Sequence, residues 1–154
     1  MEYFENKSEN TTVKELDNGV VVHMKRSSDG SYESISMKDG VRHGECKKCN
    51  VDRFESFNYV NGVRDGEIDL RLENWVEIFG YMVQGKLHGV VMVTKNTKKL
   101  FYYYIDGKNV TRAQFNEATT VDFSGSDETD GTEEDKPEEL RKLETATSSE
   151  CDSA

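Results

Sequence analysis

The sequence predicts a mainly β protein, an elongated, single-layer antiparallel sheet of hairpin repeats that ends in a short C-terminal helix and a disordered acidic tail. Three observations support this fold class. Glycine turns recur about every 22 residues along the chain. Apolar side chains alternate with polar ones before these glycines, which is the period of a β-strand. All aromatic residues lie in residues 1–123, and the end of the chain is rich in acids.

The repeat is marked by a step of Asp, Asn or Gln followed by Gly. Such steps favour tight hairpin turns, because glycine adopts a positive φ without steric cost. In three units a second glycine follows four residues after the first. We therefore expect residues 13–110 to form an array of strand, turn and strand, with these repeat turns: Gly40, Gly44, Gly62, Gly66, Gly85, Gly89 and Gly107.

The segments GVRHG, GVRDG and GKLHG, preceded at three residues by Met37, Tyr59 and Met82, resemble the divergent form of the MORN repeat. The likeness covers about residues 14–110. It implies an elongated single-layer sheet that contacts proteins or lipids. Members of this family are numerous in giant DNA viruses and in some bacteria, so a viral origin would fit the resemblance. The chain departs from the family where methionine replaces tyrosine in two units.

Counting back from each leading glycine separates two faces of the predicted sheet. One face carries apolar and aromatic residues in every unit, such as Ile35, Phe57 and Ile78, and is expected to be structural. The other begins with Ser34 and Ser36 and becomes aromatic along the array. Its last aromatic side chains are either buried within the chain or form a partner surface, and the candidates are Phe79, Tyr81, Phe101 and Tyr103.

A helix is predicted to cap the array over residues 111–118. Thr111 and Gln114 form a capping box, and Val110 with Phe115 fits the hydrophobic staple around such a start. Repeat arrays need such a cap, because a terminal unit has no neighbour against which to bury its apolar side.

Flexible ends are predicted at residues 1–12 and 119–154. Residues 124–154 contain 11 acids and 3 bases, whereas residues 1–123 contain 19 acids and 17 bases, so most of the net charge of -10 lies in the tail. The tail lacks aromatic residues and cannot bury enough apolar surface to offset the entropy of ordering. At most, residues 137–146 could form a transient helix that starts at Pro137. We expect the tail to solubilise the sheet.

One cluster in the sequence has the residue types of a metal or redox site. Cys46 and Cys49 form a CxxC motif, and His43 precedes it by three residues. The odd spacing would place the two cysteines on opposite faces of a strand, and no second CxxC completes a zinc site. His43 and His88 occupy the repeat position of Asp65, and we expect turn residues that hydrogen-bond their own backbone.

The sequence contains no phosphate loop, zinc-protease signature, nucleophile elbow or kinase motif. No catalytic residue, cofactor or metal is therefore expected, and the chain is not expected to be an enzyme. We expect a protein interaction or scaffold module, with peripheral membrane or lipid association as the alternative. Self-association through sheet edges is a further expectation, and nucleic acid is not expected as a partner, because no Lys/Arg cluster occurs.

The location expected from the sequence is intracellular and soluble. The longest uncharged apolar stretch, residues 100–105, is too short to span a membrane, and the first ten residues lack the basic and apolar regions of a signal peptide. The expected compartment is the cytoplasm of the producing or host cell, or a virion.

Overall fold

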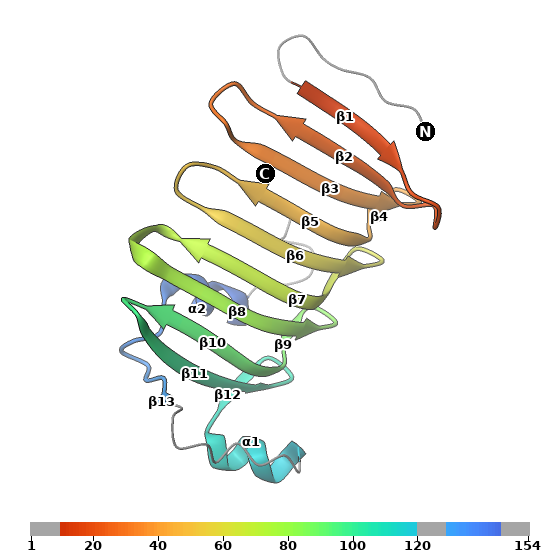
Figure 1. Ribbon diagram of the computed structural model, residues 1–154. Helices are drawn as coiled ribbons and strands as arrows, with labels where there is room; N and C mark the ends of the chain where they lie inside the picture. The colour runs from red at the N-terminus through yellow and green to blue at the C-terminus, as the bar shows by residue number, and fades with distance from the viewer. Residues whose placement is uncertain (1–9, 120–128, 146–154) are drawn as a thin grey trace.

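The chain folds into one open sheet whose strands follow each other in sequence order (Figure 1). The computed structural model describes residues 10–119 and 129–145. Within these residues the sheet has 13 strands, and all neighbouring pairs are antiparallel except β11 and β13. The predicted fold class, an open antiparallel sheet with a short C-terminal helix, is confirmed.

The long strands of the array are joined by hairpin turns. They are β1 (Asn10–Glu15), β2 (Val21–Arg26), β3 (Tyr32–Lys38), β5 (Gly44–Cys49), β6 (Phe54–Val60), β7 (Val63–Leu72), β8 (Val76–Val83), β10 (Gly89–Lys95) and β11 (Lys98–Ile105). The shorter elements are β4 (Val41–Arg42), β9 (Lys86–Leu87), β12 (Lys108–Val110) and the turn η1 (Glu73–Trp75). Because β1 begins at Asn10, residues 10–12 belong to the sheet, and residues 1–9 lie outside the described part.

Side chains alternate strictly between the two faces of the sheet. In β8, Ile78, Gly80 and Met82 are buried, whereas Phe79 and Tyr81 are exposed. We call the face of the buried residues the inner face; its core includes Phe57, Ile68, Ile78, Val91, Leu100 and Tyr102. The outer face carries the alternate residues, including Ser34, Asn58, Phe79, Phe101 and Tyr103.

Helix α1 (Arg112–Thr119) begins where the capping box predicts. The Thr111 N–H donates to Gln114 Oε1 at 2.9 Å, and the Gln114 N–H donates to Thr111 Oγ1 at 3.1 Å. Phe115 is buried, and its ring centroid lies 5.5 Å from that of Tyr103. The helix therefore covers one end of the outer face, as a terminal cap should.

The structure differs from the predicted tail in residues 129–145. They form β13 (Thr129–Asp130) and α2 (Glu138–Thr145), and α2 lies behind the sheet in Figure 1. Leu140 and Leu143 are buried in the inner-face core. Two leucines three residues apart on a helix suffice here, because the sheet supplies the rest of the apolar surface. Residues 120–128 and 146–154, where disorder was also expected, lie outside the described residues.

Polar contacts also hold this segment against the sheet. Lys136 is 6% exposed, and its Nζ donates to Glu144 at 2.7 Å, Glu133 at 2.9 Å and the Asn109 side chain at 2.9 Å. A buried ammonium is tolerated because all three of its donors have partners. Lys136 thus joins the segment before α2, the last turn of α2 and β12.

Candidate functional site

The glycine turns connect consecutive strands and lie in a row along one side of the sheet, at the ends of the strands. All seven predicted turn glycines have a positive φ, between 83 and 121°. The residue before each leading glycine, at positions 39, 61, 84 and 106, also has a φ near 50°. Two successive positive φ angles define the type I′ hairpin turn, which matches the right-handed twist of the flanking strands. These residues therefore serve the fold.

The histidines of the repeat connect neighbouring turns. His43 Nδ1 accepts from the Asn61 N–H at 3.2 Å, and His88 Nδ1 accepts from the Asp106 N–H at 3.3 Å. In the middle unit, Asp65 does the same with the N–H of residue 84. The prediction that they bond their own backbone is wrong: the donor belongs to the next turn, because successive turns stack along the sheet edge.

The cysteine cluster is separated in the structure. Cys46 is buried in the inner-face core, whereas Cys49 is only partly buried and its Sγ lies 3.7 Å from the Asn50 carbonyl oxygen. His43 bonds the next turn. Within residues 10–119 and 129–145, no group of three or more His, Cys, Asp or Glu side chains could hold a metal ion.

The four candidate residues of the outer face have different surroundings. Phe79 and Tyr81 are 45% and 46% exposed, Phe101 is partly buried, and Tyr103 is buried beneath Phe115 of α1. Met92 lies between Phe79 and Phe101 in the register of β8, β10 and β11. An apolar row therefore crosses three strands, and Phe115 of α1 packs against Tyr103 beside this row. We call Phe79, Tyr81, Met92 and Phe101 the outer patch.

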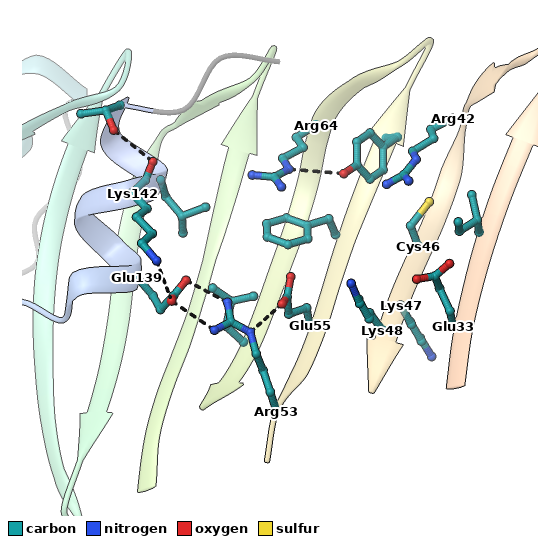
Figure 2. A pocket seen from close by; sticks show the side chains of 16 residues that line it. Glu33, Arg42, Cys46, Lys47, Lys48, Arg53, Glu55, Arg64, Glu139 and Lys142 are labelled. Carbon is teal, nitrogen blue, oxygen red and sulfur yellow. Dashed lines mark hydrogen bonds and ion pairs between the residues drawn. The ribbon is translucent and has the colours of Figure 1, made fainter. Parts of the chain in front are cut away.

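A groove of about 480 Å³ opens on the inner face beside α2 (Figure 2). Its floor is made by strands β3, β5, β6 and β7, and the side of α2 forms one wall. Five cationic and three acidic side chains of the inner face line it: Arg42, Lys48, Arg53, Arg64 and Lys142 against Glu33, Glu55 and Glu139. Lys47 also borders the groove, but its ammonium pairs with Glu45 on the outer face. This local excess of positive charge contrasts with the net charge of -10 of the whole chain.

Arg53 connects the groove to α2. Its guanidinium donates to both carboxylate oxygens of Glu139, at 2.8 and 3.1 Å, and to Glu55 at 2.6 Å. Hydrogen bonding from Arg53 lowers the pKa of Glu139, and the same bond raises the pKa of Arg53. A bidentate pair of this kind fixes both position and orientation. This pair therefore fixes the position of the side of α2 that borders the open groove.

The groove was not anticipated from the sequence, although the repeat alignment contains a signal for it. Arg42 and Arg64 occupy the third position of GVRHG and GVRDG, where GKLHG has Leu87. Leu87 is fully buried near α2, whereas the two arginines line the groove. A charged residue in one unit and an apolar residue in another mark where the same face is open and where it is covered.

Two loop tips at one edge of the sheet carry exposed apolar side chains. Val51, between β5 and β6, is 86% exposed, and Trp75, in η1, is 83% exposed. A hollow of about 670 Å³ is lined by both loops, so the tips are neighbours. Trp75 also has a φ of 61°, which is unusual for a bulky residue.

Among the described helices, none has the length and apolar character needed to cross a membrane. Comparison of the chain with protein-family models, with curated proteins and with solved structures finds no match.

Proposed function

We propose that this chain is a non-catalytic protein interaction module of the MORN-repeat type that binds a partner protein through the outer patch. The observation that carries the proposal is the exposure of Phe79 and Tyr81 on the outer face of the sheet, on which helix α1 packs against Tyr103. Large aromatic side chains with their neighbours in one continuous row are typical anchors of protein interfaces. The repeat pattern of the sequence supports the same class of protein.

The rim of the patch indicates the chemistry of the partner. Asp69 stands opposite Phe79 and Glu67 opposite Tyr81 in the register of β7 and β8. On its β7 side the apolar row is therefore bordered by Glu67 and by Asp69, which pairs with Arg71. A complementary partner would present an apolar centre with a basic residue near Glu67.

The test is affinity purification of the tagged chain from its native source. We expect the Phe79→Ser/Tyr81→Ser variant to lose a chain that co-purifies with the wild type. Met24→Ser is the matched control, because Met24 is 40% exposed on the same face but lies far along the array on β2. If every co-purifying chain is retained by the double variant, the outer patch is not the binding surface.

Peripheral membrane association is the second candidate, and the loop tips support it. Tryptophan is enriched at the membrane interface, where its ring is apolar and its N–H is hydrated. Trp75 and Val51 are both almost fully exposed at one edge, so they could enter the interface together.

This second candidate has a direct spectroscopic test, since Trp75 is the only tryptophan of the chain. Insertion should shift its fluorescence to the blue on addition of phosphatidylcholine vesicles, and the chain should float with them. Val51→Ser should weaken the effect, whereas Val60→Ser, on a strand rather than a loop tip, should not. Unchanged emission at high lipid concentration would exclude insertion of this tip.

A further inference from the structure

The inner face changes from charged to apolar along the array at equivalent repeat positions. Seven residues before the leading glycine stand Glu33 and Glu55, then Ile78 and Leu100. Two residues after it stand Arg42 and Arg64, then Leu87. The apolar members pack in the core with α2, and the charged members line the open groove. The same structural surface thus has a covered half and an open half.

The arginines of the open half are held in place by the aromatic floor. The Arg64 guanidinium lies 3.8 Å from the centroid of the Phe57 ring and donates to the Tyr59 hydroxyl at 3.4 Å. The Arg42 guanidinium lies 5.5 Å from the centroid of the Tyr59 ring, so both arginines contact this tyrosine. Stacking on an aromatic ring fixes a guanidinium without neutralising it, so the Arg64 cation is preorganised.

The acids in the groove do not neutralise all of this charge. Glu55 and Glu139 are both engaged by Arg53. Among the described residues, no carboxylate forms an ion pair with Arg64. A ligand that supplies carboxylates at the level of Arg64 would therefore gain charge-assisted hydrogen bonds with little loss of side-chain entropy.

Helix α2 shows which kind of ligand this face accommodates. It inserts Leu140 and Leu143 into the inner face and places Glu139 on Arg53 and Glu144 on Tyr104. It is thus an amphipathic helix with acids beside its apolar stripe. The open half offers the same elements one helix width away: a partly buried apolar side chain at Ile35, with cations around it.

The open half is also wide enough. The four strands β3, β5, β6 and β7 span about 14 Å at the usual spacing of neighbouring strands, and an α-helix with its side chains is about 10–12 Å across. One helix fits beside α2, and a second would not.

We propose that the open half of the inner face binds an acidic amphipathic helix of a partner protein, with its carboxylates on Arg42, Arg64 and Lys48 and its apolar stripe toward Ile35. The surface is distinct from the outer patch.

The test uses fluorescence polarisation of the full chain with a fluorescein-labelled, helix-stabilised peptide of about 14 residues, with leucines at i and i+3 and glutamates on both flanks. A matched peptide has glutamine for every glutamate. We expect the glutamate peptide to bind about tenfold more tightly, and we expect added salt to weaken its binding. Equal affinity of the two peptides would overturn the proposal.

Variants locate the site. Arg42→Gln/Arg64→Gln should weaken binding of the glutamate peptide about tenfold or more. Lys48→Gln should weaken it less, and this exposed lysine can be changed without disturbing the aromatic floor. Arg71→Gln is the control on the same strand, because Arg71 pairs with Asp69 on the outer face. Circular dichroism of each variant checks that the fold is retained.

Two results would assign the groove differently. If the folded Arg42→Gln/Arg64→Gln and Lys48→Gln variants all bind the peptide like the wild type, the site lies elsewhere. If the chain alone sediments as a dimer that the double arginine variant dissociates, a second copy occupies the groove, and the assignment to a partner protein is overturned. The Phe79→Ser/Tyr81→Ser variant should bind the peptide like the wild type. The peptide assay therefore tests the groove independently of whether the outer patch binds a partner.

Discussion

Single side chains on the turns fix the spacing between repeats. His43, Asp65 and His88 each accept a hydrogen bond from a backbone N–H in the next turn, 18 or 19 residues further along the chain. A ring nitrogen and a carboxylate oxygen thus do the same work at the same repeat position. The position requires a hydrogen-bond acceptor within reach of the backbone N–H in the next turn. Neither proton transfer nor metal binding is needed to explain the residues found there.

This interpretation predicts different results for two changes at His88. His88→Ala should lower the free energy of unfolding by about 1 kcal/mol, because the Asp106 N–H loses its acceptor. His88→Asp should stay close to the wild type, since Asp65 shows that a carboxylate fits. Urea unfolding of the three proteins measures the difference. Equal losses for alanine and aspartate would mean that the imidazole ring acts through packing.

Trp75 departs from the glycine turns of the repeat, and among the described turns it shares this departure with Thr97. Asn74 and Trp75 both have positive φ, so they form a type I′ turn whose second position usually holds glycine. The ring is almost fully exposed and therefore gains little from burial. A large residue kept in an unfavourable conformation without packing supports a role in contact with something outside the fold.

We expect Trp75→Gly to raise the free energy of unfolding by about 0.5–1 kcal/mol, because glycine removes the cost of the left-handed conformation. Trp75→Ala, which keeps the Cβ atom but loses the ring, should remain near the wild-type value. Thermal unfolding followed by circular dichroism would show both effects. A clear loss of stability in the alanine variant would reveal that the ring packs against the hairpin.

At the scale of elements, α2 is the least local feature of the fold. Arg53 and Glu139, which position it, are 86 residues apart in the sequence. Its two leucines find their partners on strands that precede it by dozens of residues. The helix therefore depends on the sheet, and changes that weaken its side-chain contacts should release it while the sheet remains folded.

Acid is one such change. Because Arg53 lowers the pKa of Glu139, protons bind more readily when α2 is released than when it is docked. The contribution of this pair to docking is complete above the ordinary glutamate pKa of about 4.3 and is lost as the pH falls through the lowered value. We expect the methyl NMR signals of Leu140 and Leu143 to shift toward random-coil positions in this range.

Glu139→Gln serves as the control for the acid response. The variant lacks the titrating carboxylate, so its docking should be weaker at neutral pH and should lose the part of the acid response that Glu139 contributes. If the variant and the wild type release α2 along the same pH curve, another acid governs docking.

The features predicted from the sequence are those encoded within a few residues. The Asp/Asn-Gly turns and the capping box at Thr111 and Gln114 depend on neighbours in the chain, and they occur where expected. Docking of residues 129–145 was not predicted, because the composition of this segment is dominated by acids and contains only two leucines. The sequence of the segment alone does not show that the sheet has an apolar face on which these leucines can pack. The groove was not predicted either, because it exists only where α2 does not cover the inner face.

At the scale of the whole molecule, the two ends of the sheet are finished differently. At one end, β12 and β13 both pair with β11, and α1 lies beyond them. At the other end, β1 pairs only with β2 among the described strands. An open edge of this kind can pair with another chain. Self-association through this edge remains a prediction, and the polar side chains of β1 limit its strength.

The segment of residues 129–145 should decide whether the sheet stays monomeric. A chain that ends at Thr119 would expose Ile78, Leu87 and Tyr104, which are fully buried in the whole molecule. We expect its free energy of unfolding to fall by at most about 2–5 kcal/mol for each missing leucine. We also expect it to bind the dye ANS and to self-associate in sedimentation velocity. Leu140→Ala/Leu143→Ala in the full chain should reproduce the exposure while keeping the acidic charge.

Two outcomes would contradict this prediction. If the double variant stays monomeric while the truncated chain associates, charge rather than helix docking prevents association between chains. If the truncated chain is as stable as the whole chain, α2 does not complete the core.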